Sequence, residues 1–165
     1  MEAFNYHAPT KIVFGKNTEK KVGQLVKKTG CKNVLVHYGG SSAKKSGLLD
    51  RVFASLTEAG IAYAELGGVV PNPRLSKVYE GIKLCQEEKI DFILAVGGGS
   101  VIDSAKAIGY GVVNEADVWD LYTGAQLPAN GCLPTGAIVT MPAAGSDNRA
   151  VSVISTEDGW VERPL

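Results

Sequence analysis

Three consecutive glycines and a serine follow a short apolar segment in the middle of the chain: Gly97, Gly98, Gly99 and Ser100. Glycine lets the backbone turn sharply and lie close to a ligand. We expect Ser100 to be the N-cap of the helix that follows. Such a turn directs unpaired backbone N–H groups and the positive end of a helix dipole at one point, which suits an anion, most often phosphate. A tight strand-to-helix turn without a ligand is the alternative, but Asp103 and Lys106 beyond the turn favour a ligand.

The elements that carry this turn follow from the hydrophobic pattern. Short apolar segments predict strands over residues 11–15, 33–38, 61–66, 92–96, 136–142 and 151–154. Helical patterns lie between them over residues 17–29, 47–60, 75–89 and 101–109, and residues 114–134 are expected to be irregular. This alternation predicts an α/β fold, an open parallel sheet with helices on both faces. Ligands bind beyond the carboxyl ends of such strands, so the polar turns should meet at one edge: residues 39–42, 67–73, 97–100 and 143–147.

The glycine turn matches neither the Gly-x-Gly-x-x-Gly dinucleotide fingerprint nor the P-loop pattern of ATPases. The whole segment 97–106 closely resembles the Gly-Gly-Gly-Ser-x-x-Asp-x-Ala-Lys segment of the iron-containing alcohol dehydrogenases. Further segments resemble the butanol-dehydrogenase branch of that family in their order and spacing, at residues 4–6, 10–15, 37–40, 71–74 and 117–120. The resemblance covers essentially the whole chain.

This resemblance implies that residues 1–165 form the N-terminal, Rossmann-like dinucleotide-binding domain, without the helical metal-binding domain of the family. The triple-glycine turn would hold the cofactor pyrophosphate, and Asp103 would lie near the nicotinamide. Asn72, Thr140 and Met141 correspond to further cofactor positions. The full set of expected cofactor residues is Gly39, Gly40, Ser41, Asn72, Gly97, Gly98, Gly99, Ser100, Asp103, Thr140, Met141 and Ser146.

The turn after the second predicted strand favours NADP(H) over NAD(H). In many dinucleotide folds an acidic side chain at this place binds the ribose 2′-hydroxyl and repels a 2′-phosphate. Residues 39–42 are glycines and serines, and Lys44 and Lys45 follow them. The turn therefore leaves room and positive potential for a phosphate, although both lysines can equally be solvated surface residues.

The chain departs from the family in two places. Ala144 stands where the family has a threonine, which removes one hydroxyl from the phosphates and about 1 kcal/mol of cofactor binding. The family also holds its Fe²⁺ or Zn²⁺ with one aspartate and three histidines of the C-terminal domain, whereas this sequence contains only His7 and His37. We expect His7 at the surface and His37 as a packed or capping residue, so we assign no metal ligand and no catalytic residue.

Composition narrows the functional classes. Seventeen basic and seventeen acidic residues give a net charge of zero, with no basic block for nucleic acid. There is no apolar run long enough for a membrane span and no secretory signal pattern, and the three cysteines form no Cys-x-x-Cys pair. These features predict a cytoplasmic protein with free thiols.

We therefore expect the chain to bind NADP(H) as part of an enzyme that interconverts small alcohols and aldehydes, and to bind without turnover when alone. A stand-alone nucleotide-binding module and a related polyol or sugar-phosphate dehydrogenase are the alternatives. An exposed contact surface for the missing domain, including Trp160 and Val161, would favour self-association.

Overall fold

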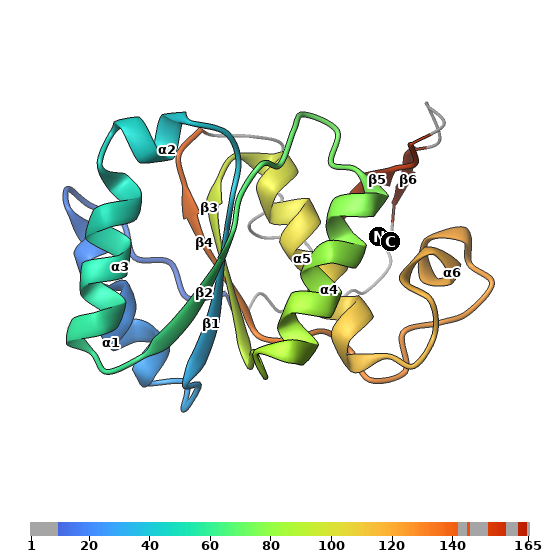
Figure 1. Cartoon of the computed structure of the whole chain (residues 1–165), viewed down its shortest axis with the longest axis horizontal. Helices are drawn as coiled ribbons and strands as arrows, with labels where there is room; N and C mark the ends of the chain where they lie inside the picture. Colours follow the sequence, from blue (N-terminus) through green and yellow to red (C-terminus); the bar gives the residue numbers. More distant parts are fainter. Residues whose placement is uncertain (1–9, 142–144, 146–151, 158–161, 165) are drawn as a thin grey trace, which may run out of the picture.

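A computed structural model describes residues 10–141, 145, 152–157 and 162–164 of the chain. Its centre is a parallel sheet of four strands in the order β2-β1-β3-β4 (Figure 1). The strands are β1 (Asn33–Tyr38), β2 (Ala62–Leu66), β3 (Phe92–Gly97) and β4 (Thr135–Val139). The two central strands, β1 and β3, are almost entirely buried, whereas the two outer strands are partly exposed. The predicted Rossmann-like open parallel sheet is therefore confirmed.

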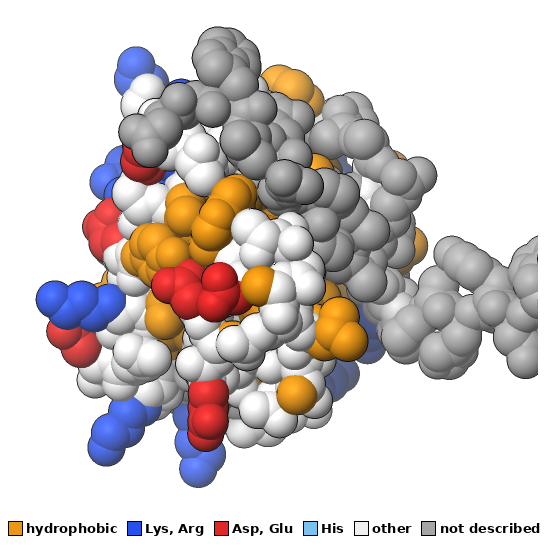
Figure 2. Space-filling model, turned by 90° about the vertical axis from the view of Figure 1, so that its right-hand side faces the viewer, with side chains coloured by type: hydrophobic (Ala, Val, Ile, Leu, Met, Phe, Trp, Pro, Cys, Tyr) orange, Lys and Arg blue, Asp and Glu red, His pale blue; other side chains and the backbone are white. Residues whose placement is uncertain are grey.

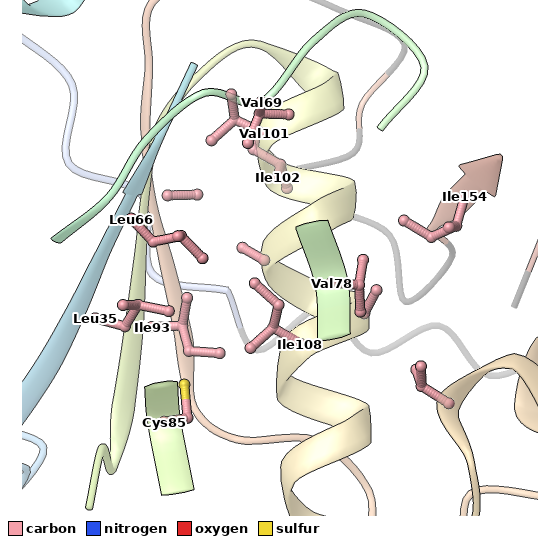
Figure 3. Close-up of a cluster of buried hydrophobic side chains, with 14 of the residues drawn as sticks. Leu35, Leu66, Val69, Val78, Cys85, Ile93, Val101, Ile102, Ile108 and Ile154 are labelled. Atoms are coloured by element: carbon pink, nitrogen blue, oxygen red, sulfur yellow. The ribbon is translucent and has the colours of Figure 1, made fainter. Parts of the chain in front are cut away.

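Alternate side chains of the central strands pack on opposite layers. Val34 and Val36 of β1 belong to a buried cluster with residues of α1 (Val22–Lys27) and α3 (Leu48–Glu58). Leu35, between them, belongs to a second cluster with residues of α4 (Leu75–Glu87) and α5 (Gly99–Val113). Figure 3 shows this second cluster, with Ile93 of β3 and Ile108 of α5 facing one another. Helices therefore cover both faces of the sheet, as two buried faces of a parallel sheet require.

Helix α5 continues past Gly109, where the sequence suggested its end. Gly109 and Gly111 are packing positions: a Cβ on Gly109 would lie 2.5 Å from Sγ of Cys132, and one on Gly111 would lie 2.2 Å from Cδ1 of Ile82. Both glycines let neighbouring segments approach the helix closely. They are therefore no sign of helix termination here.

Other sequence expectations need correction. Residues 11–14 form no strand, and Ile12 and Phe14 are exposed, 70% and 100%, because the segment pairs with none of the described strands. The helix expected over residues 17–29 begins as the short 3₁₀ helix η1 (Thr18–Lys21) and continues as α1. Two short helices, α2 (Ser42–Lys45) and α6 (Val118–Thr123), lie where the sequence predicted none.

Two short strands lie outside the main sheet. β5 (Val153–Ser155) is antiparallel to β6 (Glu162–Pro164), and it overlaps the strand expected over residues 151–154. Ser155 also forms an isolated parallel bridge with Arg74, which connects this second sheet to the loop after β2.

Apolar side chains also reach the surface, and Figure 2 shows several beside acidic side chains on one face. The exposed large hydrophobic residues are Ile12, Val13, Phe14, Tyr63, Val70, Tyr79, Leu127, Val139 and Met141. Trp160 and Val161 lie outside the described residues, so the expected self-association stays a prediction. Within the described residues, none of the helices combines the length and the apolar character that a bilayer span needs.

Candidate functional site

The strand order places the topological switch point of the sheet between the carboxyl ends of β1 and β3. The chain leaves β1 toward α2 and α3 on one face of the sheet, and leaves β3 into α5 on the other (Figure 1). The connections therefore diverge at this pair of strands. In open α/β sheets such a switch point is where ligands bind.

Backbone hydrogen bonds beyond the strands bring the predicted turns to this edge. The N–H of Thr140 donates to the carbonyl of Gly97 at 3.0 Å, and the N–H of Gly68 donates to the carbonyl of Gly39 at 3.0 Å. These bonds extend the β3·β4 and β1·β2 pairings by a residue or two past the strand ends. The turns after β1 and β2 therefore begin side by side, and so do the segments that follow β3 and β4. Residues 143–147, the fourth expected turn, lie outside the described residues except for residue 145.

The glycine turn starts α5 two residues earlier than expected. Gly98, in an extended conformation with φ −93° and ψ −167°, is the N-cap, and no side chain caps the helix. Its carbonyl accepts from the N–H groups of Val101 and Ile102, at 3.1 and 3.2 Å. The expected N-cap, Ser100, is instead within the first turn of the helix, so that expectation is wrong. A glycine N-cap leaves the first N–H groups of the helix to an external acceptor, which suits an anion.

Two glycines of the turn have different surroundings. A Cβ on Gly97 would lie 2.6 Å from Cγ2 and 3.0 Å from Cβ of Val101, so this position has no room for a side chain. A Cβ on Gly98 would meet Cβ of Met141 only at 3.9 Å, which is ordinary contact. The protein itself therefore requires a glycine at 97 but not at 98. A glycine at 98 is instead what close approach of a ligand to the backbone would require.

The turn after β1 lies against the glycine turn. A Cβ on Gly39 would be 3.5 Å from Cγ2 of the same Val101, so one side chain lies beside both turns. Gly40 and Ser41 are exposed. Lys44, on α2, places its Nζ 5.2 Å from the ring centroid of Tyr38, and a hydrogen bond with that tyrosine raises the pKa of Lys44.

The remaining predicted cofactor residues differ in their exposure to solvent. Asp103 is half-buried on α5, about one turn beyond the glycine turn, and its Oδ1 atom is buried. Thr140 and Met141 directly follow β4 and are exposed. Ser146 and Ala144 lie outside the described residues. The structure thus gathers the glycine turns and Thr140 at one edge, and the cofactor roles of all these residues remain predictions.

Asn72 lies in a shaped loop after β2 and adopts a left-handed conformation, with φ 56°. The segment that contains β5 is hydrogen-bonded to this loop. The N–H of Ser155 donates to the carbonyl of Pro73 at 3.0 Å, and Nη1 of Arg74 donates to the carbonyl of Thr156 at 3.0 Å. No local pattern in the sequence indicates this support, because its two halves lie about 80 residues apart.

His37 is completely buried at the end of β1, which confirms that it is a packed residue. Its Nδ1 lies 2.9 Å from the carbonyl of Leu66, and its Nε2 lies 2.8 Å from Oγ of Ser104. Burial lowers the pKa of His37 from 6.5 to about 4. Both ring nitrogens are occupied within the fold, so the residue does not serve as a metal ligand in this arrangement.

The described residues do not form a binding site for the metal ion of the iron-containing alcohol dehydrogenases. Within the described ranges, no three His, Cys, Asp or Glu side chains lie close enough together to bind a metal ion. The three cysteines, Cys31, Cys85 and Cys132, are free thiols. Burial raises the pKa of Cys85 to about 12, as expected for a structural thiol.

Comparison with known proteins gives consistent matches. A family model described as iron-containing alcohol dehydrogenase matches residues 9–164. The chain is 46% identical over 165 residues to the probable NADH-dependent butanol dehydrogenase 1 of Bacillus subtilis, covering 97% of this chain and 42% of the relative. It is 38% identical over 157 residues to the NADPH-dependent aldehyde reductase YqhD of Escherichia coli, covering 94% of this chain and 40% of the relative.

Comparison with solved structures matches the same kind of protein. The crystal structure of NADH-dependent butanol dehydrogenase A from Thermotoga maritima superimposes with a TM-score of 0.96 at 42% identity, over 100% of this chain and 41% of that one. The chain thus spans about two fifths of the length of these relatives.

Proposed function

Because the chain belongs to the iron-containing alcohol dehydrogenase family, we propose that the carboxyl edge of its sheet binds NADP(H). The observation that carries this proposal is the glycine turn between β3 and α5, with a glycine N-cap at the switch point of the sheet. The first-turn N–H groups of α5 would receive the pyrophosphate, and the turn of Gly39, Gly40 and Ser41 would receive the adenosine ribose. The cofactor supplies the hydride chemistry when bound.

The preference for NADP(H) rests on the turn after β1. No acidic side chain stands among residues 39–42, and Lys44 and Lys45 follow on α2. A 2′-phosphate therefore meets no like charge from this turn and has two cations nearby. The relatives differ on this point, since the Bacillus subtilis protein is called NADH-dependent and the Escherichia coli protein NADPH-dependent.

The test is a fluorescence titration of the 165-residue chain with NADPH and with NADH. We expect saturable binding of both, with NADPH binding more tightly. The absence of saturable binding of either nucleotide would refute the proposed function. Equal or tighter binding of NADH would refute only the preference.

Gly39→Asp tests the assignment of the turn itself. A Cβ at this position makes only ordinary contacts at 3.5 Å, so the chain should accept the side chain. The new carboxylate should repel the 2′-phosphate and favour NADH, shifting the NADPH-to-NADH affinity ratio about 10-fold or more. Gly39→Asn has the same shape without the charge and is the matched control. An unchanged ratio in Gly39→Asp, or the same shift in Gly39→Asn, would contradict the assignment.

For the whole protein we propose reversible hydride transfer between a small alcohol or aldehyde and NADP(H). The described residues include no group of three His, Cys, Asp or Glu side chains that could hold the metal ion of the family. We expect the 165-residue chain alone to bind NADPH without oxidising it. Aldehyde-dependent loss of NADPH absorbance, with Fe²⁺ or Zn²⁺ added, measures this directly, and turnover by the chain alone would show that it already holds the catalytic residues.

A further inference from the structure

We propose that the buried pair His37 and Ser104 positions the glycine turn for cofactor binding. This inference rests on the proposed function, because it assigns the pair a part in the same site. Neither residue lies at the ligand edge itself, so both are positioning residues. Their action runs through α5 and the strand ends beneath the turn.

The location of His37 makes it a junction between three elements. It is the penultimate residue of β1, it pairs in register with Leu66 of β2 and Ala95 of β3, and it is 0% exposed. Its Nε2 contacts Oγ of Ser104 on α5, and Ser104 is also 0% exposed. Its Nδ1 contacts the carbonyl of Leu66, the last residue of β2. One side chain therefore connects β1, β2 and α5.

The two hydrogen-bond partners of His37 determine which tautomer of its neutral ring is present. A carbonyl oxygen accepts and never donates, so the Nδ1–H of His37 donates to Leu66. A neutral imidazole has its acceptor on the other nitrogen, so Nε2 accepts the hydroxyl proton of Ser104. Desolvation keeps the ring neutral and lowers its pKa to about 4, while Lys77 and Glu80 of α4 act on it in opposite directions. The two hydrogen bonds thus have one direction each and a fixed geometry.

These bonds lie directly beneath the proposed site. His37 precedes Gly39 by two residues, Leu66 precedes the loop that contains Asn72, and Ser104 lies one helical turn after Ser100. The other contacts of α5 with the sheet belong largely to an apolar cluster. Apolar contacts are non-directional, whereas a hydrogen bond fixes the rotation and axial position of a helix. The pair therefore sets where the N-terminal N–H groups of α5 point.

Ser104→Ala is the first test, because it removes one hydroxyl from a buried site and leaves the backbone unchanged. We expect the dissociation constant for NADPH to rise about 5- to 10-fold, the equivalent of one hydrogen bond. Ile108→Val is the matched control. It removes one methyl from a fully buried residue on the same helix and should lower the melting temperature without changing the dissociation constant.

His37→Asn provides a second, independent variant. An asparagine amide can still donate toward Leu66 but does not reach Ser104. The effects of His37→Asn and Ser104→Ala on NADPH affinity should therefore be non-additive in the double variant, as expected for two residues that share one interaction. Because the sequence contains only two histidines, ¹⁵N NMR of the imidazoles can also identify the Nδ1–H tautomer of His37 directly.

The outcomes separate the inference from the proposed function. Weaker NADPH binding in Ser104→Ala but not in Ile108→Val, with the Nδ1–H tautomer in the wild type, supports the inference. Wild-type affinity in Ser104→Ala, equal losses in both variants, or additive effects in the double variant would overturn it while the proposed function stands. If the wild-type chain binds no NADPH, the proposed function fails, and the positioning role fails with it.

Discussion

Adding one methyl group at each of two adjacent glycines, Gly97→Ala and Gly98→Ala, should produce opposite phenotypes. The two residues differ in what a Cβ would touch. At Gly97 it would lie 2.6 Å from Cγ2 and 3.0 Å from Cβ of the buried Val101, and at Gly98 it would lie 3.9 Å from Cβ of Met141. The first variant should therefore lose stability, and the second should lose ligand affinity.

For Gly97→Ala, the magnitude follows from overpacking. Val101 is 5% exposed, and its β-branched side chain has little rotameric freedom in a helix, so the clash moves the helix or the turn. An extra methyl in a packed interior costs about 1–3 kcal/mol. For a chain of this size, a loss of about 2 kcal/mol lowers the melting temperature by roughly 4–8 °C.

For Gly98→Ala, folding should be almost unchanged. Its φ of −93° and ψ of −167° are open to any L-residue. Alanine is a poorer N-cap than glycine, which lowers stability, but it also reduces the conformational entropy of the unfolded chain, which raises stability. The two effects nearly cancel, so the free energy of unfolding changes by about 0.5 kcal/mol or less. The methyl would stand where the pyrophosphate approaches and would displace it from a backbone N–H. Losing one charge-assisted hydrogen bond, about 1.5–3 kcal/mol, weakens NADPH binding about 10-fold or more.

Circular dichroism melts and NADPH titrations of both variants test the reasoning together. A Gly98→Ala chain that melts like the wild type and binds NADPH equally well would show that the pyrophosphate does not lie on this turn. A Gly97→Ala chain with an unchanged melting temperature would show that Val101 does not pack on Gly97 as described.

Two further predictions concern stability. Burial keeps the folded-state pKa of His37 at about 4, against 6.5 when unfolded, so the unfolded chain binds more protons between these values. The neutral ring therefore contributes about 3 kcal/mol to the free energy of unfolding above pH 6.5, and this contribution is lost as the pH falls toward 4. Urea denaturation between pH 7.5 and 4.5 measures the loss. His37→Asn should make the free energy of unfolding less dependent on pH. Asp117 caps α6 through its Oδ1, which accepts from the N–H of Trp119 at 2.8 Å and from the hydroxyl of Tyr79 at 2.6 Å. Asp117→Ala should cost about 1 kcal/mol, whereas Asp117→Asn should retain most of the cap; equal stability of both variants and the wild type would contradict the capping role.

The sheet was predictable because its strands are continuous apolar segments between clear turns. β1 has the predicted bounds, and β3 extends one residue further, into Gly97. The sequence also indicated that the turns after these strands meet at one edge of the sheet, but the switch point depends on the strand order β2-β1-β3-β4, which the structure shows. Local patterns therefore located the glycine turns of the candidate site.

The remaining features depend on partners that are distant in sequence. Ile12, Val13 and Phe14 are as apolar as a strand, but they pair with none of the described strands. Gly109 and Gly111 have the composition of a helix break, although Cys132 and Ile82 pack against them inside a continuing helix. The sequence indicated that His37 was packed, but it contained no sign of Ser104, 67 residues away. Close packing and buried hydrogen bonds leave no periodicity in the sequence.

Helix α6 does have a signal in the sequence, although its hydrophobic pattern is too short to show it. Asp117 directly precedes the apolar residues of α6, and an aspartate in that position is a common N-cap. The helix is only six residues long and ends at Gly124, so its hydrophobic period is not visible. A cap therefore identifies a short helix better than its hydrophobic period does.

The place of Val101 between the two glycine turns has an evolutionary consequence. Gly97 cannot acquire a side chain without displacing Val101, whereas Gly39 faces the same valine across an ordinary contact distance of 3.5 Å. We therefore expect substitutions at 39 to be nearly neutral for folding and substitutions at 97 to lower stability. If the two turns have the proposed roles, we expect the cofactor preference to change through substitutions at 39 while the turn at 97 stays intact.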